Sequence, residues 1–397
     1  MIGAGVFGAF APAARAAGGL LLVALAIAAV VAYCNATSSA RLAALYPESG
    51  GTYVYGRRRL GDFWGYLAGW GFVVGKIASC AAMALTVGAY AFPGHARLVA
   101  ILAVAAVTAL NLFGVHKSAL ATWIIVVLVL LVLAAVVVAG LSGPHRSVTG
   151  GAGGGNVLEA AGLLFFAFAG YARIATLSEE VADPARTIPR AVPIALAITL
   201  LVYVAVAVAA LSALGPAGLA ASTAPLADTV AAAGAGFLAP VVRAGAAIAA
   251  LGSLLALVLG VSRTTLAMAR DRHLPGFLAA VHPQRHIPHR AEAAVGIVVM
   301  LLVAFLDLRG AIGFSSFGVL VYYAIANASA LTLRRDEGPP PRIVPVAGLA
   351  GCLLLAATLP LSSVLSGLAL FAVGALLWLA RRGTRPGRRG PAATPSA

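Results

Sequence analysis

The sequence is poor in charged residues, and poorest in acidic ones. Only 10% of its 397 residues are charged and 61% are hydrophobic, whereas charged residues make up about a quarter of an average soluble domain. Lysine and arginine together number 27, and aspartate and glutamate together number 12. This composition excludes an ordinary soluble domain. Long apolar runs separated by short loops instead indicate a polytopic membrane protein.

Cysteine is also scarce, and histidine is absent from the interior of the apolar runs. The three cysteines lie far apart in apolar segments, at Cys34, Cys80 and Cys352, so they form neither a disulfide framework nor a metal spacing. His282, His286 and His289 lie close together, but Pro283 and Pro288 break any helix there. We interpret that segment as a solvated loop. We therefore expect no metal and no cofactor, and nothing supports an intramembrane enzyme.

The sequence contains many apolar segments. A helix needs about 20 residues to span a bilayer. They lie near residues 1–14, 18–40, 62–92, 97–115, 119–141, 157–178, 190–214, 237–268, 292–307, 311–333, 343–359 and 363–380. Eleven can span a bilayer, some with interfacial flanks, whereas the first is short and contains three glycines in MIGAGVFGAF. We therefore predict twelve spans, of which the first is incomplete.

The net charge of +15 comes from basic residues that fall in alternate loops. Arg57–Arg59, Arg270–Arg272 and the tail Arg381–Arg389 lie on one predicted side, which the positive-inside rule makes cytoplasmic. Both termini are then cytoplasmic, in a multi-pass protein of the inner (plasma) membrane. Because this pattern is the signature of insertion into a lipid bilayer, we reject nucleic acid as a partner. A signal peptide is disfavoured because no basic region precedes the first apolar stretch.

Two spans contain glycine interruptions, at Gly3-Ala4-Gly5 and at Ala169-Gly170 in FFAFAGYARIATLSEE. They lie five spans apart, so each begins a five-helix half. Interrupted segments at matching places in two halves indicate a transporter binding site, because a broken helix exposes backbone groups that must line a cavity or meet a ligand. The alternative is that these glycines only allow close helix packing.

Four stretches resemble the amino acid–polyamine–organocation (APC) superfamily of permeases. IGAGVFG resembles its helix 1, FFAFAGYARIATLSEEVADPARTIPRAV its helix 6 and the following loop, YPESGGTYVYGRR the loop after helix 2, and ARDRHLPGF the loop after helix 8. The resemblance implies an all-α LeuT-like fold of two inverted five-helix repeats with two additional C-terminal helices. It also implies that about half a helix precedes the first motif, so we expect that Met1 occupies an internal position and that the first helix is truncated.

The domain limits follow from this resemblance. A transporter domain is predicted over 1–380, with helices 1–5 over 1–141, helices 6–10 over 157–333 and helices 11–12 over 343–380. Residues 381–397 are predicted to be a disordered basic cytoplasmic tail.

The resemblance also assigns a binding site for an amino acid. The backbone amides of Gly3, Ala4 and Gly5 would hold the substrate carboxylate, and carbonyls around the break would hold its amine. The carbonyls are those of Phe166, Ala167 and Ala169, and the break lies at Ala169-Gly170. The resemblance also assigns the ring of Phe166 as an aromatic gate over the substrate.

The sequence departs from the family pattern in its charged groups. Arg173 follows the helix 6 break where an acidic residue is common, and Val129 stands where many proton-coupled relatives have a lysine. Lys76, in the middle of GFVVGKIASCAAMAL, is our candidate for a proton-linked switch, because a desolvated lysine can lose its proton and an arginine effectively cannot. The alternative is a static pair between Lys76 and a carboxylate.

Three further residues are predicted to act in gating or coupling. Glu179 and Glu180 resemble inner-gate residues and are possible partners of Arg173, and Ser253 is a hydroxyl of helix 8 that faces helix 1 in relatives. One serine is too little to indicate a sodium site.

We therefore predict a secondary active transporter that moves neutral or acidic amino acids by alternating access, coupled to protons or by exchange. A polyamine or cationic amino acid carrier is the alternative, and it is disfavoured because Lys76 and Arg173 would repel such a substrate. A transporter-like nutrient sensor is also considered, but the sequence shows no large soluble segment.

Overall fold

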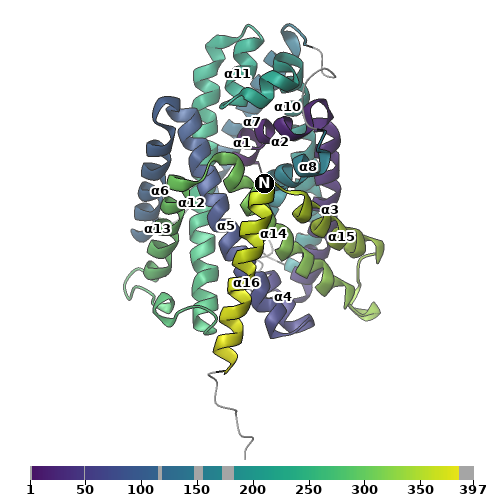
Figure 1. Ribbon diagram of the computed structural model, residues 1–397, viewed down its shortest axis with the longest axis vertical. Coiled ribbons are helices and arrows are strands. Elements are labelled where there is room, and N and C mark those ends of the chain that lie inside the picture. Colours follow the sequence, from purple (N-terminus) through teal and green to yellow (C-terminus); the bar gives the residue numbers. More distant parts are fainter. Residues whose placement is uncertain (1, 49, 115–118, 147–154, 172–182, 384–397) are drawn as a thin grey trace, which may run out of the picture.

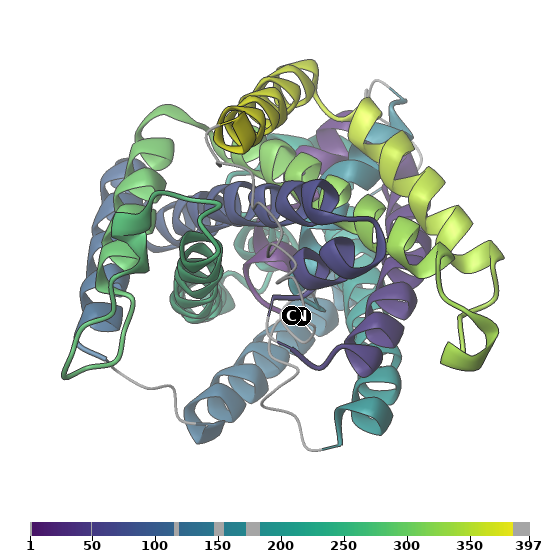
Figure 2. The same cartoon turned by 90° about the horizontal axis from the view of Figure 1, so that it is seen from below.

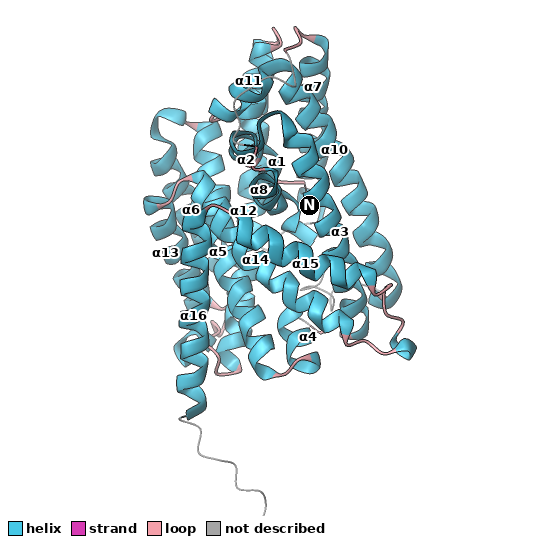
Figure 3. Cartoon of the chain, turned by 45° about the vertical axis from the view of Figure 1, so that its right-hand side comes forward, coloured by secondary structure: helices cyan, strands magenta, loops and turns pink. Residues whose placement is uncertain are grey.

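The computed structural model describes residues 2–48, 50–114, 119–146, 155–171 and 183–383, and within them it contains helices and no strand (Figure 1; Figure 3). The α-helices are α1 Ala4–Gly8, α2 Phe10–Ala17, α3 Leu21–Leu45, α4 Thr52–Arg59, α5 Asp62–Ala91, α6 Ala96–Leu112, α7 Ala119–Ser142, α8 Val157–Phe168, α10 Pro184–Ala221, α11 Pro225–Ala232, α12 Ala239–Arg270, α13 His289–Phe305, α14 Leu308–Leu331, α15 Ile343–Thr358 and α16 Leu361–Gly383. The predicted all-α class is confirmed.

Among the residues that the structure describes, eight helices are long and apolar enough to cross a membrane, which confirms the polytopic architecture. They are Phe10–Leu45, Asp62–Ala91, Pro93–Leu112, Thr122–Ser142, Arg186–Ala221, Gly236–Arg270, Leu308–Leu331 and Leu361–Arg381. Two shorter apolar helices, α8 and α15, accompany them. The twelve-span count and the division into two repeats stay predictions.

The first apolar segment contains two short helices, α1 and α2. The amide of Ala9 donates to the carbonyl of Gly5 (3.0 Å), and the amide of Ala13 donates to the carbonyl of Ala9 (3.2 Å), so helical hydrogen bonding continues across their junction. Gly18 then takes a φ of 56°, a left-handed value that favours glycine, and the chain turns into α3. The interruption was expected at Gly3-Ala4-Gly5, but Ala4 and Gly5 are helical and only Gly3 lies outside the helix.

Helix α5 runs through the middle of the molecule between α12 and α14 (Figure 2). Small residues allow α5 and α14 to approach closely, since a Cβ added at Gly318 would lie 2.9 Å from the Cα of Gly75. Helices α1, α2 and α8 pack against one another, and α1 also contacts this central helix (Figure 1). The interrupted segments expected to form a site are therefore neighbours in space.

Basic residues gather at one end of the molecule. Helix α4 and the loop between α12 and α13 lie at one end, which we call the basic end, and α11 lies at the opposite end (Figure 1). The basic end includes Arg57, Arg58 and Arg59 of α4 and Arg270 at the end of α12.

Candidate functional site

A cavity of about 340 Å³ lies among α1, α5, α7, α8 and α12. This volume is within the range of small-molecule sites, roughly 300–1,000 Å³. Its wall is mostly apolar and includes Phe72, Met83, Ile125, Val129 and Leu257. The polar side chains that line it are Lys76, Ser79, Thr122 and Ser253. Among the described lining residues, Lys76 is the single charged one, and there is no carboxylate.

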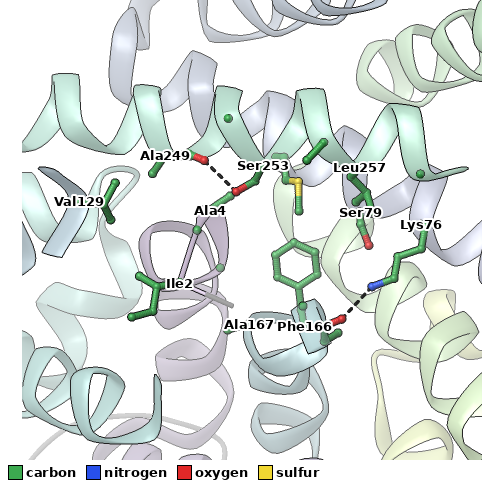
Figure 4. Close-up of a pocket in the computed structure, with 18 of the residues that line it drawn as sticks. Ile2, Ala4, Lys76, Ser79, Val129, Phe166, Ala167, Ala249, Ser253 and Leu257 are labelled. Atoms are coloured by element: carbon green, nitrogen blue, oxygen red, sulfur yellow. Dashed lines mark hydrogen bonds between the residues drawn. The ribbon is translucent and has the colours of Figure 1, made fainter. Parts of the chain in front are cut away.

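The cavity brings together nine residues predicted from the sequence (Figure 4). They are Gly3, Ala4, Gly5, Lys76, Phe166, Ala167, Ala169, Gly170 and Ser253. Arg173, Glu179 and Glu180 lie outside the described residues. The nine lie in or directly beside four helices that are far apart in the sequence, and the fold brings them to one cavity. Their roles in binding and gating stay predictions.

The start of α1 is in very close contact with its neighbours. A Cβ added at Gly3 would lie 2.4 Å from Ser253 Oγ, and one at Gly5 would lie 2.6 Å from the backbone Cα of Ala167. Ser253 Oγ itself donates to the carbonyl of Ala249 (2.8 Å). Gly5 therefore lets α1 pack against α8, which is the alternative that the sequence left open. Because Gly3 has no side chain, its backbone lines the cavity directly, next to Ser253.

Helix α8 ends where the sequence predicts a break. Its last residue is Phe168, and Ala169–Tyr171 form a single 3₁₀ turn. The amide of Ala169 donates to the carbonyls of Phe165 and Phe166. The hydroxyl of Tyr203, on α10, donates to the carbonyl of Ala167 (3.0 Å). A partner from another helix therefore satisfies a backbone group that the break releases.

Lys76 satisfies a second carbonyl at the break, that of Ala169. Its Nζ donates to the carbonyl of Ala169 (3.1 Å), and only 5% of the residue is exposed (Figure 4). Among the described residues no carboxylate lies within 4.0 Å of this ammonium. The static pair with a carboxylate is thus absent from the part of the chain that the structure describes. A buried cation held by one backbone oxygen is unusual and costly.

A second polar cluster lies at the basic end, and sequence reasoning missed it. The Tyr53 hydroxyl donates to the Asp271 carboxylate and lies 2.8 Å from His273 Nδ1. Arg57 pairs with Asp271 (2.7 Å) and with Asp62 (3.5 Å). Burial, together with the hydrogen bond to Asp271, raises the pKa of Tyr53 above its usual range. Tyr53 and Arg57 lie in the motif YPESGGTYVYGRR, and Asp271 and His273 lie in the motif ARDRHLPGF. Nothing in the sequence of either motif indicates that the two meet in the fold.

Glu292 was also missed. It lies in the first turn of α13, is 1% exposed, accepts a hydrogen bond from Asn111 Nδ2 (2.6 Å) and accepts another from the Ser262 hydroxyl. Its carboxylate joins α6, α12 and α13 and does not line the cavity. An acidic residue directly before an apolar run is the signal that could have pointed to it.

Comparison with known proteins supplies the family context. The model of the amino acid permease family matches residues 1–380. An uncharacterized transporter of Mycobacterium tuberculosis (strain H37Rv) is 66% identical over 387 residues, which cover 96% of this chain and 88% of the relative. The branched-chain amino acid permease BcaP of Bacillus subtilis is 26% identical over 95% of this chain and 89% of its own length. The human cationic amino acid transporter 4 is 27% identical over 86% of this chain and 58% of its own length.

Proposed function

Because the chain belongs to the amino acid permease family, we propose that it is a secondary active transporter that moves neutral or acidic amino acids by alternating access. The observation that carries this proposal is the cavity itself, which combines apolar walls with one buried ammonium and no described carboxylate. The Lys76 ammonium suits a substrate carboxylate. The backbone at Gly3, Ala4 and Gly5 is the second candidate contact for the same carboxylate.

The charge of the cavity supports the proposed substrate class. A cationic side chain or a polyamine needs carboxylates in the wall, and the described wall offers Lys76 instead. A neutral side chain fits the apolar residues Ile125, Val129 and Leu257. The relatives carry names of both kinds, branched-chain and cationic, so their names alone leave the choice open. Cationic amino acids remain the second candidate because of the cationic amino acid transporters among the relatives.

The orientation proposed here puts the basic end in the cytoplasm. Arg57, Arg58 and Arg59 of α4 and Arg270 of α12 support this assignment. The protein would then be a multi-pass component of the plasma membrane with both termini inside.

We assign the coupling step to Lys76. A buried amine that can exchange a proton with water would carry charge in one state of the cavity and lose it in another. Proton-driven accumulation would follow, and amino acid exchange would need no net proton movement.

The test is an uptake panel in proteoliposomes. Radiolabelled alanine, leucine, glutamate, arginine and putrescine are offered with and without an inward proton gradient. The proposal expects uptake of alanine or leucine, or of glutamate, and stimulation by the gradient. Uptake confined to arginine or putrescine would contradict the substrate class, and uptake of none of the five would contradict the proposed function.

A further inference from the structure

The carbonyls at the end of α8 are already engaged. Phe166 accepts from the amide of Ala169, Ala167 accepts from the hydroxyl of Tyr203, and Ala169 accepts from the ammonium of Lys76. These are the oxygens that the family resemblance assigns to a substrate ammonium. A substrate that carries an ammonium must share or displace one of these hydrogen bonds.

Lys76 differs from the other two donors because it is itself an ammonium. It lines the cavity, and its Nζ occupies the carbonyl of Ala169 at 3.1 Å (Figure 4). A substrate ammonium at the same oxygen would lie beside a like charge with no described carboxylate in the wall to offset the two. A substrate without an ammonium meets no such conflict, and its carboxylate gains a buried cationic partner.

Resting on the proposed function, which makes this cavity the substrate site, we propose that it also accepts 2-hydroxy monocarboxylates with apolar side chains. Lys76 supplies from the protein the ammonium that these acids lack. One Nζ carries three donor hydrogens, so it can keep the carbonyl of Ala169 and donate to the substrate carboxylate. The apolar wall around Ile125, Val129 and Leu257 then receives the side chain.

Matched pairs of ligands test this proposal on the purified full chain. L-lactate is compared with L-alanine, and L-2-hydroxyisocaproate with L-leucine, because each pair differs only in the hydroxyl or ammonium group. The measured quantity is the ratio of the dissociation constants of hydroxy acid and amino acid. We expect a ratio below about ten in the wild type for at least one pair. Binding of the amino acids with a ratio above ten in both pairs would overturn the inference and leave the proposed function standing.

Substitution of Lys76 gives the second arm of the test. In Lys76→Met the carbonyl of Ala169 is free to take the substrate's own ammonium, so the ratio should rise at least tenfold in favour of the amino acid. Ser79→Ala is the matched control, since Ser79 lines the same cavity one turn further along α5; it should change the ratio less than threefold. A ratio that stays within threefold of the wild type in Lys76→Met would overturn the inference.

Two precautions keep the result interpretable. If Lys76→Met does not fold, Lys76→Gln removes the like charge beside the substrate's own ammonium, so the ratio should again rise in favour of the amino acid. Binding of hydroxy acids without any amino acid would support the inference and contradict amino acid transport. Binding of neither ligand class would overturn both.

Discussion

The charged groups of the cavity and those of the basic end are held in opposite ways. In the cavity Lys76 has a single described partner, the carbonyl of Ala169. At the basic end Arg57 pairs with Asp271 and Asp62, Arg58 with Glu48, and Arg59 with Glu337. Lys76 is 5% exposed, whereas the side chains of Arg57 and Asp271 are 38% and 39% exposed.

This difference indicates different roles for the two regions. The charges at the basic end are compensated in the structure itself, so they need no ligand, and the Arg57–Asp271 pair ties α4 to the end of α12. The buried ammonium of Lys76 lacks compensation among the described residues, so an anion that enters the cavity gains a strong partner. The comparison therefore separates charges that are paired within the structure from the buried ammonium of Lys76, which we propose pairs with substrate.

The largest effect is expected from Lys76→Met, which removes the uncompensated charge. Accumulation driven by a proton gradient should fall at least tenfold, because the titrating group is gone, while exchange at saturating substrate should persist. The measurement is uptake and counterflow in proteoliposomes. Lys76→Arg fixes the charge and should also lose coupling. Accumulation with the wild-type pH dependence in Lys76→Met would move the coupling role to Glu179 or Glu180.

The second prediction tests the packing of the cavity wall. Gly5→Leu should reduce folded yield several-fold, because the new side chain meets the backbone of Ala167 at 2.6 Å. Gly260→Ala is the control, since a Cβ there meets nothing within 4 Å although the residue lines the same cavity. Size-exclusion profiles in detergent measure the yield. A normal profile for Gly5→Leu would show that α1 can move away from α8.

The third prediction concerns the contact between α4 and the end of α12 at the basic end. A double-mutant cycle of Arg57→Ala and Asp271→Ala should give a coupling free energy of unfolding of about 0.5–1 kcal/mol, as expected for a half-exposed pair. The Arg58–Glu48 pair, with both side chains 50% exposed, should give less. Denaturant titration in micelles measures both cycles. A coupling near zero for Arg57 and Asp271 would remove the structural role given to this cluster.

The smallest effect is expected at Glu337. Its hydrogen bond from Arg59, with a second from the amide of Arg334, lowers its pKa below the usual value. A lowered folded-state pKa gives stability that is present above the unfolded pKa of about 4.3 and lost as pH falls through the folded value. Glu337→Gln should therefore show a shallower loss of melting temperature on acidification from pH 6 to 3. Parallel curves for both proteins would contradict this.

Local features of the sequence predicted much of this arrangement. The end of α8 at Phe168 follows from the Ala169-Gly170 break, and Lys76 stood out because a charge in an apolar run is rare. Periodicity and composition carry no information about which distant groups meet. The contacts of Lys76 with Ala169 and of Arg57 with Asp271 join residues 93 and 214 positions apart, so only the fold could supply them.

The glycines of the first segment show the same limit. Their spacing resembles that of a substrate-binding helix, and the sequence alone could not separate backbone exposure from helix packing. The structure assigns Gly5 to packing against Ala167, because the two backbones leave no room for a side chain. Gly3 lies outside the helix and beside Ser253 in the cavity wall.

The central claim is that substrate binds in the cavity among α1, α5, α7, α8 and α12, and protection of a cysteine there tests it most directly. The three native cysteines are buried, so a Ser253→Cys variant that still transports can be alkylated with low background. Gln284→Cys, in the exposed loop after α12, is the control. The amino acid taken up fastest in the panel should slow alkylation of Ser253→Cys at least fivefold and leave Gln284→Cys unchanged. Equal alkylation rates of Ser253→Cys with and without that amino acid would contradict the claim.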